Sequence, residues 1–502
     1  MTVLSSSLRA AAHRFPGRMA LVHESLALRY RQLDVLVDRL AAGLARQGVR
    51  AGDLVALSLP AGAEYVAAYL ALARIGAVTT GVNPRLRPAE RAAVLTAAAP
   101  QLVLATEELG EGVPSGCPVL GCVPAREAAA VWHGLLEDTA PPPEPAEDPV
   151  WPETVVFTSG TTGVPRGALF TSRQIAAITA MDTEGQWGTG GPLLVATGLP
   201  HVGFMTKLAG HLQSGATLHV LGHWRAADAL RVIAREHVPY IGGVAAQISL
   251  LLHHPSFESY DFSHVRGLMV GGGPSPAATV REARARFGAG YSVRYSLTES
   301  GGLGTLTRFD APEEETLHTA GRPRPGITLE IRDPDTGHRM GLGETGEIVL
   351  GGDTVMAGYW RDPQATARVL SPDRRLCTGD LGFLGEDGCL RVTGRIKDMY
   401  IRGGYNVFPH EVEAVLLDHP GVQAVAVVPR PDPVMGEIGV AVVVPRPGVP
   451  AVTLDELRAF AAPRLARYKL PEALRLAAEL PLTSMDKVDR RLLAQVEQRA
   501  RA

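Results

Sequence analysis

At 502 residues the chain is too long for a single hydrophobic core, so we expect several domains. A formal net charge of −3, with 46% hydrophobic and 20% charged residues, is ordinary for a soluble globular protein and argues against nucleic acid as a bulk partner. The 4 cysteines lack metal-binding spacings, which indicates reduced structural thiols. No stretch has the roughly 18 apolar residues of a transmembrane helix, and the first residues lack the apolar core of a signal peptide, so we expect a cytoplasmic protein.

Helix and strand patterns alternate along the first part of the chain. Apolar residues at spacings of three and four predict a helix over 32–47, and a strand over 54–59 and a helix over 64–77 follow. A proline-rich connector is expected over 141–145. Further elements are strands at 154–157, 193–197 and 218–221, and helices at 226–236 and 277–287. This alternation predicts a layered, mainly parallel α/β core.

The pattern changes in the last third of the chain. From Glu344 to about residue 394, short strands punctuated by glycine predict a smaller β-rich lobe. A helix over 410–418, strands over 422–428 and 439–444 and a helix over 454–464 then predict a small α+β domain. We therefore expect a large N-terminal domain over 1–394, a hinge over 395–398 and a mobile C-terminal domain over 399–502.

A glycine- and hydroxyl-rich loop directly follows the strand at 154–157. Glycines allow backbone N–H groups to converge on an anion, hydroxyls add donors, and an arginine supplies charge. The loop lacks the P-loop pattern of NTPases, so it handles phosphate in another way. The predicted phosphate-binding residues are Thr158, Ser159, Gly160, Thr161, Thr162, Gly163 and Arg166.

Four further motifs join this loop in a resemblance to the adenylate-forming superfamily, which includes acyl-CoA synthetases, peptide-synthetase adenylation domains and firefly-type luciferases. They are Tyr-Ser-Leu-Thr-Glu (295–299), Thr-Gly-Asp (378–380), Gly-Arg-Ile-Lys-Asp with a glycine-rich block (394–398 and 403–411), and the lysine motif at 481–490. In their order and coverage the motifs are most similar to AMP-forming acyl-CoA synthetases. The resemblance implies that ATP and Mg²⁺ convert a carboxylic acid to an acyl-adenylate, which a thiol, that of CoA, then attacks.

The resemblance also implies roles for the motif residues. Glu299 would hold Mg²⁺, Thr298 would contact the α-phosphate, and Lys487 would bridge that phosphate and the acid. Asp380 would bind the ribose hydroxyls, Arg395 would add a second nucleotide contact, and Tyr295 would stack on adenine. The expected adenine-site neighbours are Gly271, Gly272, Gly273 and Ser296.

The sequence defines the acid pocket less closely than it defines the nucleotide site. His201 stands where amino-acid adenylation domains carry an Asp for the substrate's amino group, which favours a plain carboxylic acid. Gly243, Gly301 and Gly302 are expected wall residues, and the volume they leave favours a medium-to-long acyl or an aryl group. Arg294 precedes Tyr295 as in malonyl-CoA synthetases, so a dicarboxylate stays open.

The second half-reaction requires a moving C-terminal domain and a thiol channel. The resemblance assigns the hinge to Lys397 and the pantetheine passage to Gly403 and Gly404, with Arg402 a candidate for the CoA 3′-phosphate. A carrier-protein phosphopantetheine is the alternative thiol, because CoA and an acyl or peptidyl carrier protein both present pantetheine. An acyl- or nucleotide-binding regulator and a luciferase-like oxidation are minor alternatives, and the oligomeric state stays open.

The chain departs from the family pattern at four positions. They are Arg166 in place of Lys, Ser296 in place of Gly, Gly351 in place of Arg, and Asp486 in place of the Gly before the catalytic lysine. None removes a group that the chemistry requires, so we expect them to tune the activity. Arg and Lys differ in geometry, and the Arg166 departure therefore affects phosphate contacts most directly.

Overall fold

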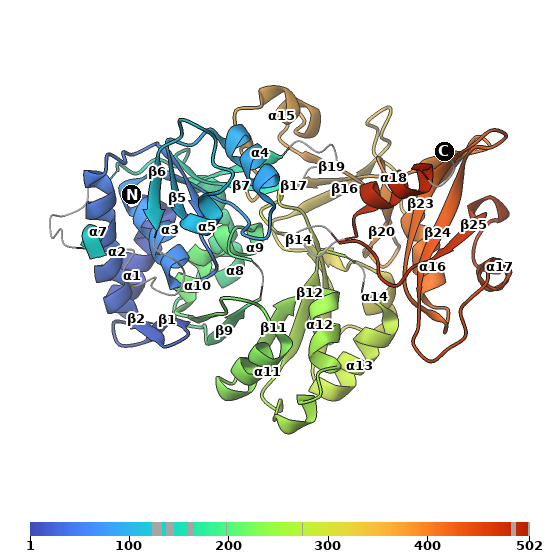
Figure 1. The fold of residues 1–502 in the computed structure, drawn as a ribbon, viewed down its shortest axis with the longest axis horizontal. Coiled ribbons are helices and arrows are strands. Elements are labelled where there is room, and N and C mark those ends of the chain that lie inside the picture. The colour runs from blue at the N-terminus through green and yellow to red at the C-terminus, as the bar shows by residue number, and fades with distance from the viewer. Residues whose placement is uncertain are drawn as a thin grey trace.

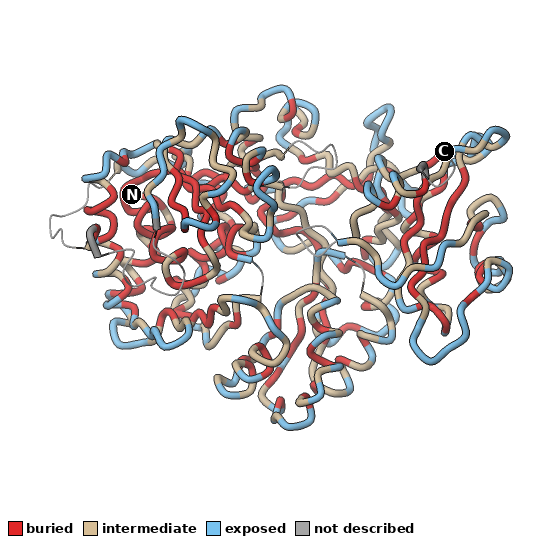
Figure 2. Tube along the Cα trace, viewed as in Figure 1, coloured by how far each residue is buried: buried red, intermediate tan, exposed pale blue. Residues whose placement is uncertain are grey.

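The computed structural model describes residues 1–122, 133–136, 145–158, 165–196, 198–273, 275–482 and 488–499. Figure 1 shows an N-terminal body, a lobe built around β11 and β12, and a C-terminal domain coloured orange to red, with β16 to β20 between them. Buried residues are concentrated in the strands and in the helices packed against them (Figure 2). The expected α/β class, with a large N-terminal and a small C-terminal domain, is confirmed.

The largest sheet has seven strands in the order β18-β8-β7-β4-β3-β5-β6. Strands β3 to β7 pair in parallel, whereas β8 and β18 are antiparallel at one edge. The strands are β3 (Leu54–Ser58), β4 (Val78–Gly81), β5 (Leu102–Thr106), β6 (Val119–Cys122), β7 (Pro152–Thr158), β8 (Arg166–Thr171) and β18 (Gly358–Tyr359). Because β7 and β8 form a hairpin, the predicted phosphate loop connects two paired strands.

A second sheet lies on the other side of helix α3 (Ala63–Ile75), which contacts β3 and β4 of the first sheet and β1 of the second. Almost every residue of α3 is apolar and buried, as expected for a helix with no solvent-facing side. The second sheet has the order β2-β1-β10-β9. Its strands are β1 (Met19–His23), β2 (Leu26–Arg29), β9 (Pro192–Val195) and β10 (Thr217–Val220). Helix α2 (Tyr30–Arg46) contacts β1 and β2, whereas α8 (Ser172–Thr183) contacts β7 and β8 of the first sheet, and α1 (Val3–Arg14) packs against α2, α3, α8 and α10 (Leu208–Ser214).

The second lobe carries a five-stranded sheet in the order β11-β12-β13-β14-β15. Its first three strands are parallel, and the helices between them cover the sheet with a hydrophobic core of their own. The elements are β11 (Tyr240–Gly243), β12 (Gly267–Gly271), β13 (Gly290–Ser296), β14 (Gly304–Leu306), β15 (Arg322–Pro323), α11 (Ala226–Arg235), α12 (Ala245–Leu252) and α13 (Ala277–Phe287).

The β-rich lobe begins earlier than expected. An antiparallel sheet joins β16 (Thr328–Arg332), β17 (Gly346–Gly351), β19 (Leu376–Leu384) and β20 (Leu390–Arg395). The expected start at Glu344 is therefore wrong, since β16 already alternates buried and exposed side chains from Thr328. Strand β18 and helix α15 (Pro363–Val369) interrupt the lobe, and β18 pairs with β8 of the large sheet.

The C-terminal domain has a sheet in the order β22-β21-β24-β23, with β25 paired to β24. Its core of apolar side chains is separate from those of the N-terminal domain. The elements are β21 (Tyr400–Arg402), β22 (Tyr405–Val407), β23 (Val422–Asp432), β24 (Gly436–Pro445), β25 (Ala473–Leu476), α16 (Pro409–Leu417), α17 (Leu454–Ala461) and α18 (Arg490–Arg499).

Each helix and strand named from the sequence has a counterpart, although β23 and β24 extend beyond their expected ends. The α-helices not yet named are α4 (Pro88–Ala98), α5 (Glu107–Gly110), α7 (His133–Leu136), α9 (Val202–Met205) and α14 (Glu313–His318), and all of them except α4 are short. Most of the proline-rich connector lies outside the described residues. Among the helices that the structure describes, none is long and apolar enough to cross a membrane.

Candidate active site

The parallel strands of the second lobe bring several predicted residues to one edge. Strands β11, β12 and β13 end at Gly243, Gly271 and Ser296, and the carboxyl ends of parallel strands meet at the same edge of a sheet. A Cβ atom on Gly271 would lie 3.2 Å from the backbone oxygen of Arg294, so glycine permits this close approach. Gly272, with φ of +82°, begins the turn after β12 in a conformation that favours glycine.

Asp380 is buried and lies at the centre of a polar cluster. The register of β19 and β20 places it opposite Arg395, whose Nε is 2.8 Å from Asp380 Oδ1. The hydroxyl of Tyr295 donates a hydrogen bond of 2.8 Å to Oδ2. Burial, reinforced by the Asp380 charge, raises the pKa of Tyr295 well above its usual range, so the phenol keeps its proton. A carboxylate has further lone pairs, so Asp380 retains capacity for ribose hydroxyls.

Glu299 forms a second polar cluster with a residue that the motifs did not indicate. The Tyr359 hydroxyl donates a 2.8 Å hydrogen bond to Glu299 Oε1, and the Arg166 guanidinium lies 5.7 Å from the centre of the Tyr359 ring. Burial and the neighbouring Glu299 raise the pKa of Tyr359, which therefore remains a donor. The signal for Tyr359 in the sequence is weak: an aromatic residue after Gly358 in a two-residue strand.

Part of the predicted phosphate site can be located. Thr158 and Arg166 are cross-strand partners in the β7–β8 hairpin, and the Thr158 hydroxyl donates to the Arg166 carbonyl at 3.4 Å. The loop residues between them, Ser159, Gly160, Thr161, Thr162 and Gly163, lie outside the described residues, as do Lys487 and Asp486. The roles assigned to these residues therefore stay predictions.

A tight turn follows β13 and carries three more predicted residues. The Gly301 amide donates to the Thr298 carbonyl at 2.9 Å, and Gly301 and Gly302 have φ values of +70° and +71°. Thr206 donates a 3.3 Å hydrogen bond to the Gly301 carbonyl, which joins this turn to the segment that starts at His201. The turn thus brings Gly301 and Gly302 beside the His201 segment.

Two charged residues near this turn escaped the motif analysis. A Cβ atom on Gly302 would lie 3.7 Å from Cε of Lys207, and the Lys207 ammonium lies 2.8 Å from Asp182 Oδ2. Neither Lys207 nor Asp182 belongs to a recognisable motif, so only the fold reveals their proximity to the predicted acid pocket.

The predicted wall residue Gly243 lies at the end of β11. It faces Gln247, whose side chain donates to the Ala196 carbonyl at 3.0 Å.

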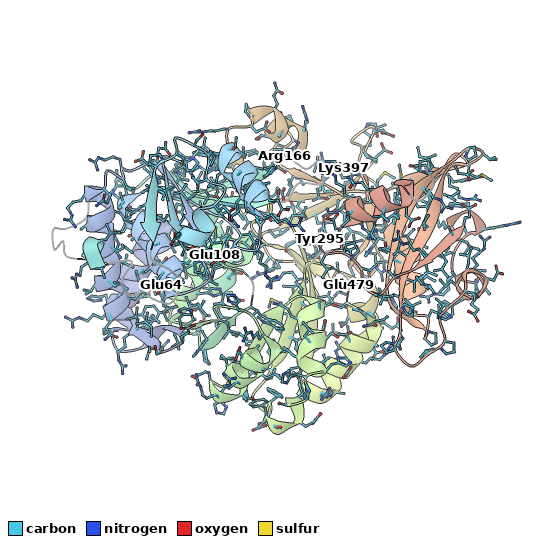
Figure 3. All side chains as sticks on the ribbon, viewed as in Figure 1. Glu64, Glu108, Arg166, Tyr295, Lys397 and Glu479 are labelled. Atoms are coloured by element: carbon cyan, nitrogen blue, oxygen red, sulfur yellow. The ribbon has the colours of Figure 1, made fainter. Side chains whose placement is uncertain are left out.

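The predicted hinge and thiol residues lie where the two domains join. Lys397 is exposed in the turn between β20 and β21, and Figure 3 shows it, with Arg166 and Tyr295, in the central region of the molecule. Gly403 and Gly404, with φ of +55° and +86°, form the turn of the β21–β22 hairpin, which accounts for both glycines structurally. The Arg402 guanidinium is paired with Glu472, with Nε 3.0 Å from Oε2.

The departure at Gly351 also has a structural explanation. A Cβ atom on Gly351 would lie 2.5 Å from the Thr328 hydroxyl, and the Arg375 side chain lies 3.5 Å away. Arg375 in turn pairs with Glu330 at 2.8 Å. The lobe therefore carries a cation beside the position where the family pattern has its arginine.

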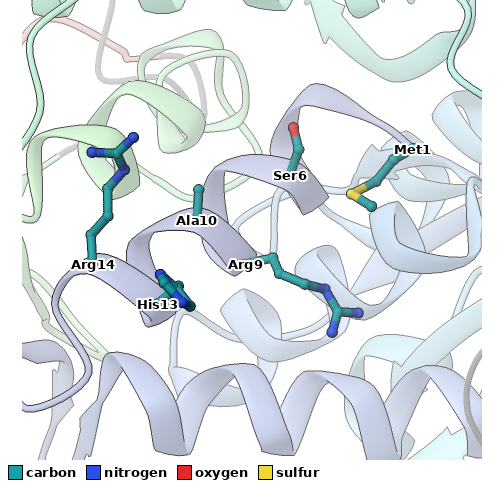
Figure 4. A pocket seen from close by; sticks show the side chains of 6 residues that line it. All are labelled: Met1, Ser6, Arg9, Ala10, His13 and Arg14. Atoms are coloured by element: carbon teal, nitrogen blue, oxygen red, sulfur yellow. The ribbon is translucent and has the colours of Figure 1, made fainter.

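A surface pocket lies along helix α1 in the N-terminal body (Figure 4). It is lined by Met1, Ser6, Arg9, Ala10, His13 and Arg14. None of these side chains belongs to the predicted site, so the chemistry expected of this chain does not involve this pocket.

Comparison with known families agrees with the site geometry. The model of the AMP-binding enzyme family matches residues 8–360, and that of the AMP-binding enzyme C-terminal domain matches residues 411–487. The chain therefore belongs to the AMP-binding enzyme family, the adenylate-forming superfamily whose motifs it carries.

Individual relatives indicate which class of enzyme within this family the chain resembles. The chain is 34% identical over 487 residues to a feruloyl-CoA synthase from Amycolatopsis sp, with 95% of each chain covered. It is 31% identical over 504 residues to the fatty acid–[acyl-carrier-protein] ligase ScoC from Streptomyces coeruleorubidus, covering 98% of this chain and 96% of that one. The o-succinylbenzoate CoA synthetase MenE from Bacillus subtilis, solved with an acyl-adenylate intermediate, superposes with a TM-score of 0.83, 28% identity and 97% of each chain covered.

These relatives identify the chain as an enzyme of the AMP-forming acyl-CoA synthetase class. At this level its activity is the ligation of an acid to CoA, and enzymes of its family use ATP and CoA.

Proposed function

We propose that this enzyme activates a carboxylic acid in two steps. In the first, a carboxylate oxygen bonds to the α-phosphorus of ATP as the bond to pyrophosphate breaks, giving an acyl-adenylate. In the second, the sulfur of CoA bonds to the acyl carbon and AMP leaves. The convergence of Asp380, Tyr295 and Arg395 beside the cluster of Glu299 and Tyr359 is the observation that supports this proposal.

The first step concentrates negative charge on phosphate oxygens, so its catalysis depends on positioning and neutralisation. Asp380 would hold the ribose through its free lone pairs, while Arg395 fixes the carboxylate. Thr158 and Arg166, at the two ends of the phosphate loop, would contact the distal phosphates, and Thr298 the α-phosphate. Lys487 is proposed to bridge the α-phosphate and the acid, which the family resemblance implies.

Glu299 is the proposed protein ligand of Mg²⁺. The donor set fits this ion, because Mg²⁺ binds through one or two carboxylates together with phosphate oxygens and water. Among the described residues no three His, Cys, Asp or Glu side chains form a metal cluster, so the nucleotide would supply most ligands. Bound there, Mg²⁺ would neutralise phosphate charge. Tyr359 holds the Glu299 carboxylate through its hydrogen bond and thereby orients it.

The proposed acid is a carboxylic acid without an α-amino group, with a medium-to-long acyl or an aryl body. The name of the feruloyl-CoA synthase relative supports an aryl acid. Among the wall glycines, a Cβ atom on Gly302 would have its nearest neighbour at 3.5 Å, whereas Cβ atoms on Gly301 and Gly243 would lie 2.6 and 2.8 Å from other protein atoms, so packing rather than substrate volume accounts for those two glycines. His201, at the start of helix α9, is proposed to gate this pocket. The substrate would enter from the carboxyl edge of β11 to β13.

Loading of a carrier-protein thiol is the second candidate function. The guanidinium of Arg402, the candidate for the CoA 3′-phosphate, is already paired with Glu472, so CoA would compete with that carboxylate. The name of the ScoC relative supports the same candidate. In both candidates, the C-terminal domain would turn about Lys397 to admit pantetheine beside Gly403 and Gly404.

The test incubates the purified protein with ATP, Mg²⁺ and a panel of acids, adding either CoA or a phosphopantetheinylated carrier protein. Mass spectrometry then measures AMP and the acyl thioester. We expect equal amounts of AMP and acyl-CoA with at least one acid. Thioester on the carrier protein alone would establish the second candidate, and absence of AMP with every acid would overturn both.

A further inference from the structure

Three charged side chains from separate segments meet next to the predicted acid pocket, and a fourth, Arg294, lies at the strand edge beside Gly271. Asp182 lies in the last turn of α8, Lys207 directly precedes α10, Arg294 lies on β13, and Arg324 follows β15. The Lys207 Nζ is 2.8 Å from Asp182 Oδ2, and Arg324 Nη1 is 2.8 Å from Asp182 Oδ1. Helices α8 and α10 pack against each other, which brings the first two residues together.

The charges of this cluster do not balance. Lys207 and Arg324 share the single Asp182 carboxylate, and Arg294 forms no ion pair with a described carboxylate, which leaves an excess of positive charge. The Lys207 side chain is only 7% exposed, so solvent does little to compensate it. His211, the remaining titratable neighbour, adds no charge near pH 7, since burial lowers its pKa to about 4. Buried charge without a partner is costly, and the cluster therefore favours one further anion.

The cluster also has hydrogen-bond donors without acceptors. Within the part of the chain that the structure describes, Arg294 Nε has no hydrogen-bond partner, and Arg294 Nη2 contacts only the weak acceptor Sδ of Met269. The Lys207 ammonium contacts Asp182 as an ion pair but does not meet hydrogen-bond geometry. A guanidinium and an ammonium with unused donors match a carboxylate, which accepts several hydrogen bonds.

The position of the cluster points to the acid rather than to ATP. Lys207 Cε lies beside Gly302, and the Arg294 side chain lies beside Gly271, so both cations adjoin glycines of the predicted pocket and strand edge. The nucleotide-side residues Asp380 and Glu299 have their own partners. An anion that reached Lys207 would therefore belong to the far end of the acid substrate.

We propose that the Lys207 cluster binds a second anionic group, a carboxylate at the far end of the acid substrate, and that Lys207 is the main residue selecting for it. The proposal rests on the proposed acid-activating function and deepens it by naming the substrate class. It assigns Arg294 a supporting role, in which its unused Nε donates to the same carboxylate. Asp182 then holds Lys207 in place until the substrate adds its charge.

The experiment compares matched acids with the wild-type enzyme and the Lys207→Met variant. Straight-chain monoacids are paired with α,ω-dicarboxylic acids of equal carbon count, and cinnamate with para-carboxycinnamate. At the preferred length we expect wild-type kcat/KM to favour the diacid by about tenfold or more. Hydrogen bonds to charged groups are worth roughly 1.5–3 kcal/mol, so Lys207→Met should lower kcat/KM for the diacid about 10- to 100-fold, mainly through KM. The monoacid should change less than about threefold.

Two controls separate this role from a structural one. Lys469→Met removes another paired lysine, whose Nζ lies 2.6 Å from Glu411 in the C-terminal domain, and should leave the diacid-to-monoacid ratio unchanged. If Lys207→Met fails to fold, the pH dependence of KM for the wild-type enzyme provides the test instead. Burial lowers the pKa of Lys207 to about 8, so KM for the diacid should rise above that pH while KM for the monoacid does not.

The outcomes are distinct. Preference for the monoacid at every length, or an equal loss for both acids in Lys207→Met, would overturn this proposal and leave acid activation standing. A flat KM for the diacid through the pH range in which a measurement of folding stability shows Lys207 losing its charge would also count against it. Absence of AMP with every acid would overturn the proposed function and this proposal with it.

Discussion

The two ends of the site differ in how their charges are balanced. At the nucleotide end, Asp380 is paired with Arg395, and the Glu299 carboxylate accepts from Tyr359. At the acid end, Asp182 is the carboxylate for both the buried Lys207 and Arg324, and among the described residues Arg294 Nε has no hydrogen-bond partner. The nucleotide end is thus assembled before any ligand binds, whereas the acid end lacks an anion. The difference teaches that the charge of a ligand can be inferred from the charge that a cluster of protein side chains leaves unbalanced.

The largest effect should come from breaking the nucleotide end at Asp380. Asp380→Asn removes the charge that holds Arg395 and Tyr295 and weakens the proposed ribose contact. We expect kcat/KM for ATP to fall about 100- to 1000-fold, since more than one hydrogen bond to a charged group is weakened. Acid-dependent exchange of pyrophosphate into ATP measures this step alone.

A ribose contact predicts a second readout for the same variant. The wild-type enzyme should prefer ATP over 2′-deoxy-ATP, and Asp380→Asn should reduce that preference. Thermal unfolding of both proteins separates loss of fold from loss of contact. An unchanged preference in a folded variant would mean that Asp380 serves Arg395 and Tyr295 but not the nucleotide.

Tyr359 offers a smaller perturbation of the same end. Tyr359→Phe keeps the ring beside Arg166 but removes the hydroxyl that donates to Glu299. The loss of one hydrogen bond to a carboxylate should raise the Mg²⁺ concentration for half-maximal adenylation about 10-fold or more. The measurement is a Mg²⁺ titration at saturating ATP, with Glu299→Gln as the reference for loss of the ligand. An unchanged Mg²⁺ requirement would show that Glu299 needs no help in positioning.

The sequence led to most residues of the balanced end, with the exception of Tyr359, but not to Lys207 or Asp182 at the other end, and the reason is physical. Asp380 and Arg395 lie in motifs that were found through their resemblance to the family, and the register of β19 and β20 places the two residues opposite each other. The alternation of elements likewise predicted the layered fold, because periodicity reports which faces are buried. The contact between Asp380 and Arg395 is therefore set within one strand pair.

The features that the sequence did not predict depend on tertiary contacts. Asp182 lies in α8 and Lys207 directly precedes α10, and neither has a sequence pattern that distinguishes it from a solvated surface charge. Tyr359 reaches Glu299 only because β18 leaves the β-rich lobe to pair with β8. The early start of that lobe at Thr328 was missed since β16 lies before the glycine-rich segment that marked it.

The acid end can be tested without any substrate through the stability of the fold. Burial lowers the pKa of Lys207 to about 8, although Asp182 opposes the shift, against an ordinary value of 10.5. Between these pH values the unfolded chain holds one more proton at this site than the folded one, so this group makes the fold more stable as pH rises. The slope is at most about 1.4 kcal/mol per pH unit.

Lys207→Met lacks this contribution. The wild-type free energy of unfolding, measured in urea, should therefore increase relative to that of the variant between pH 8 and 10.5, and the difference should be constant below that window. A difference that stays constant throughout would mean that Lys207 remains charged in the folded protein up to its ordinary pKa. The excess of positive charge would then persist at high pH, and KM for the diacid would not rise.

The smallest effect is expected at Arg166, where the chain has arginine in place of the family's lysine. Its guanidinium lies 5.7 Å from the centre of the Tyr359 ring, a contact worth about 0.5–1 kcal/mol at a partly exposed site. Arg166→Lys keeps the charge for phosphate but weakens this stacking, so we expect kcat/KM for ATP to fall only about 2- to 5-fold. Arg166→Met removes the charge, so its kcat/KM for ATP should be lower still in the same pyrophosphate-exchange assay. If Arg166→Lys costs as much as Arg166→Met, the planar fork itself binds phosphate, and the nucleotide end depends on bidentate geometry rather than on charge alone.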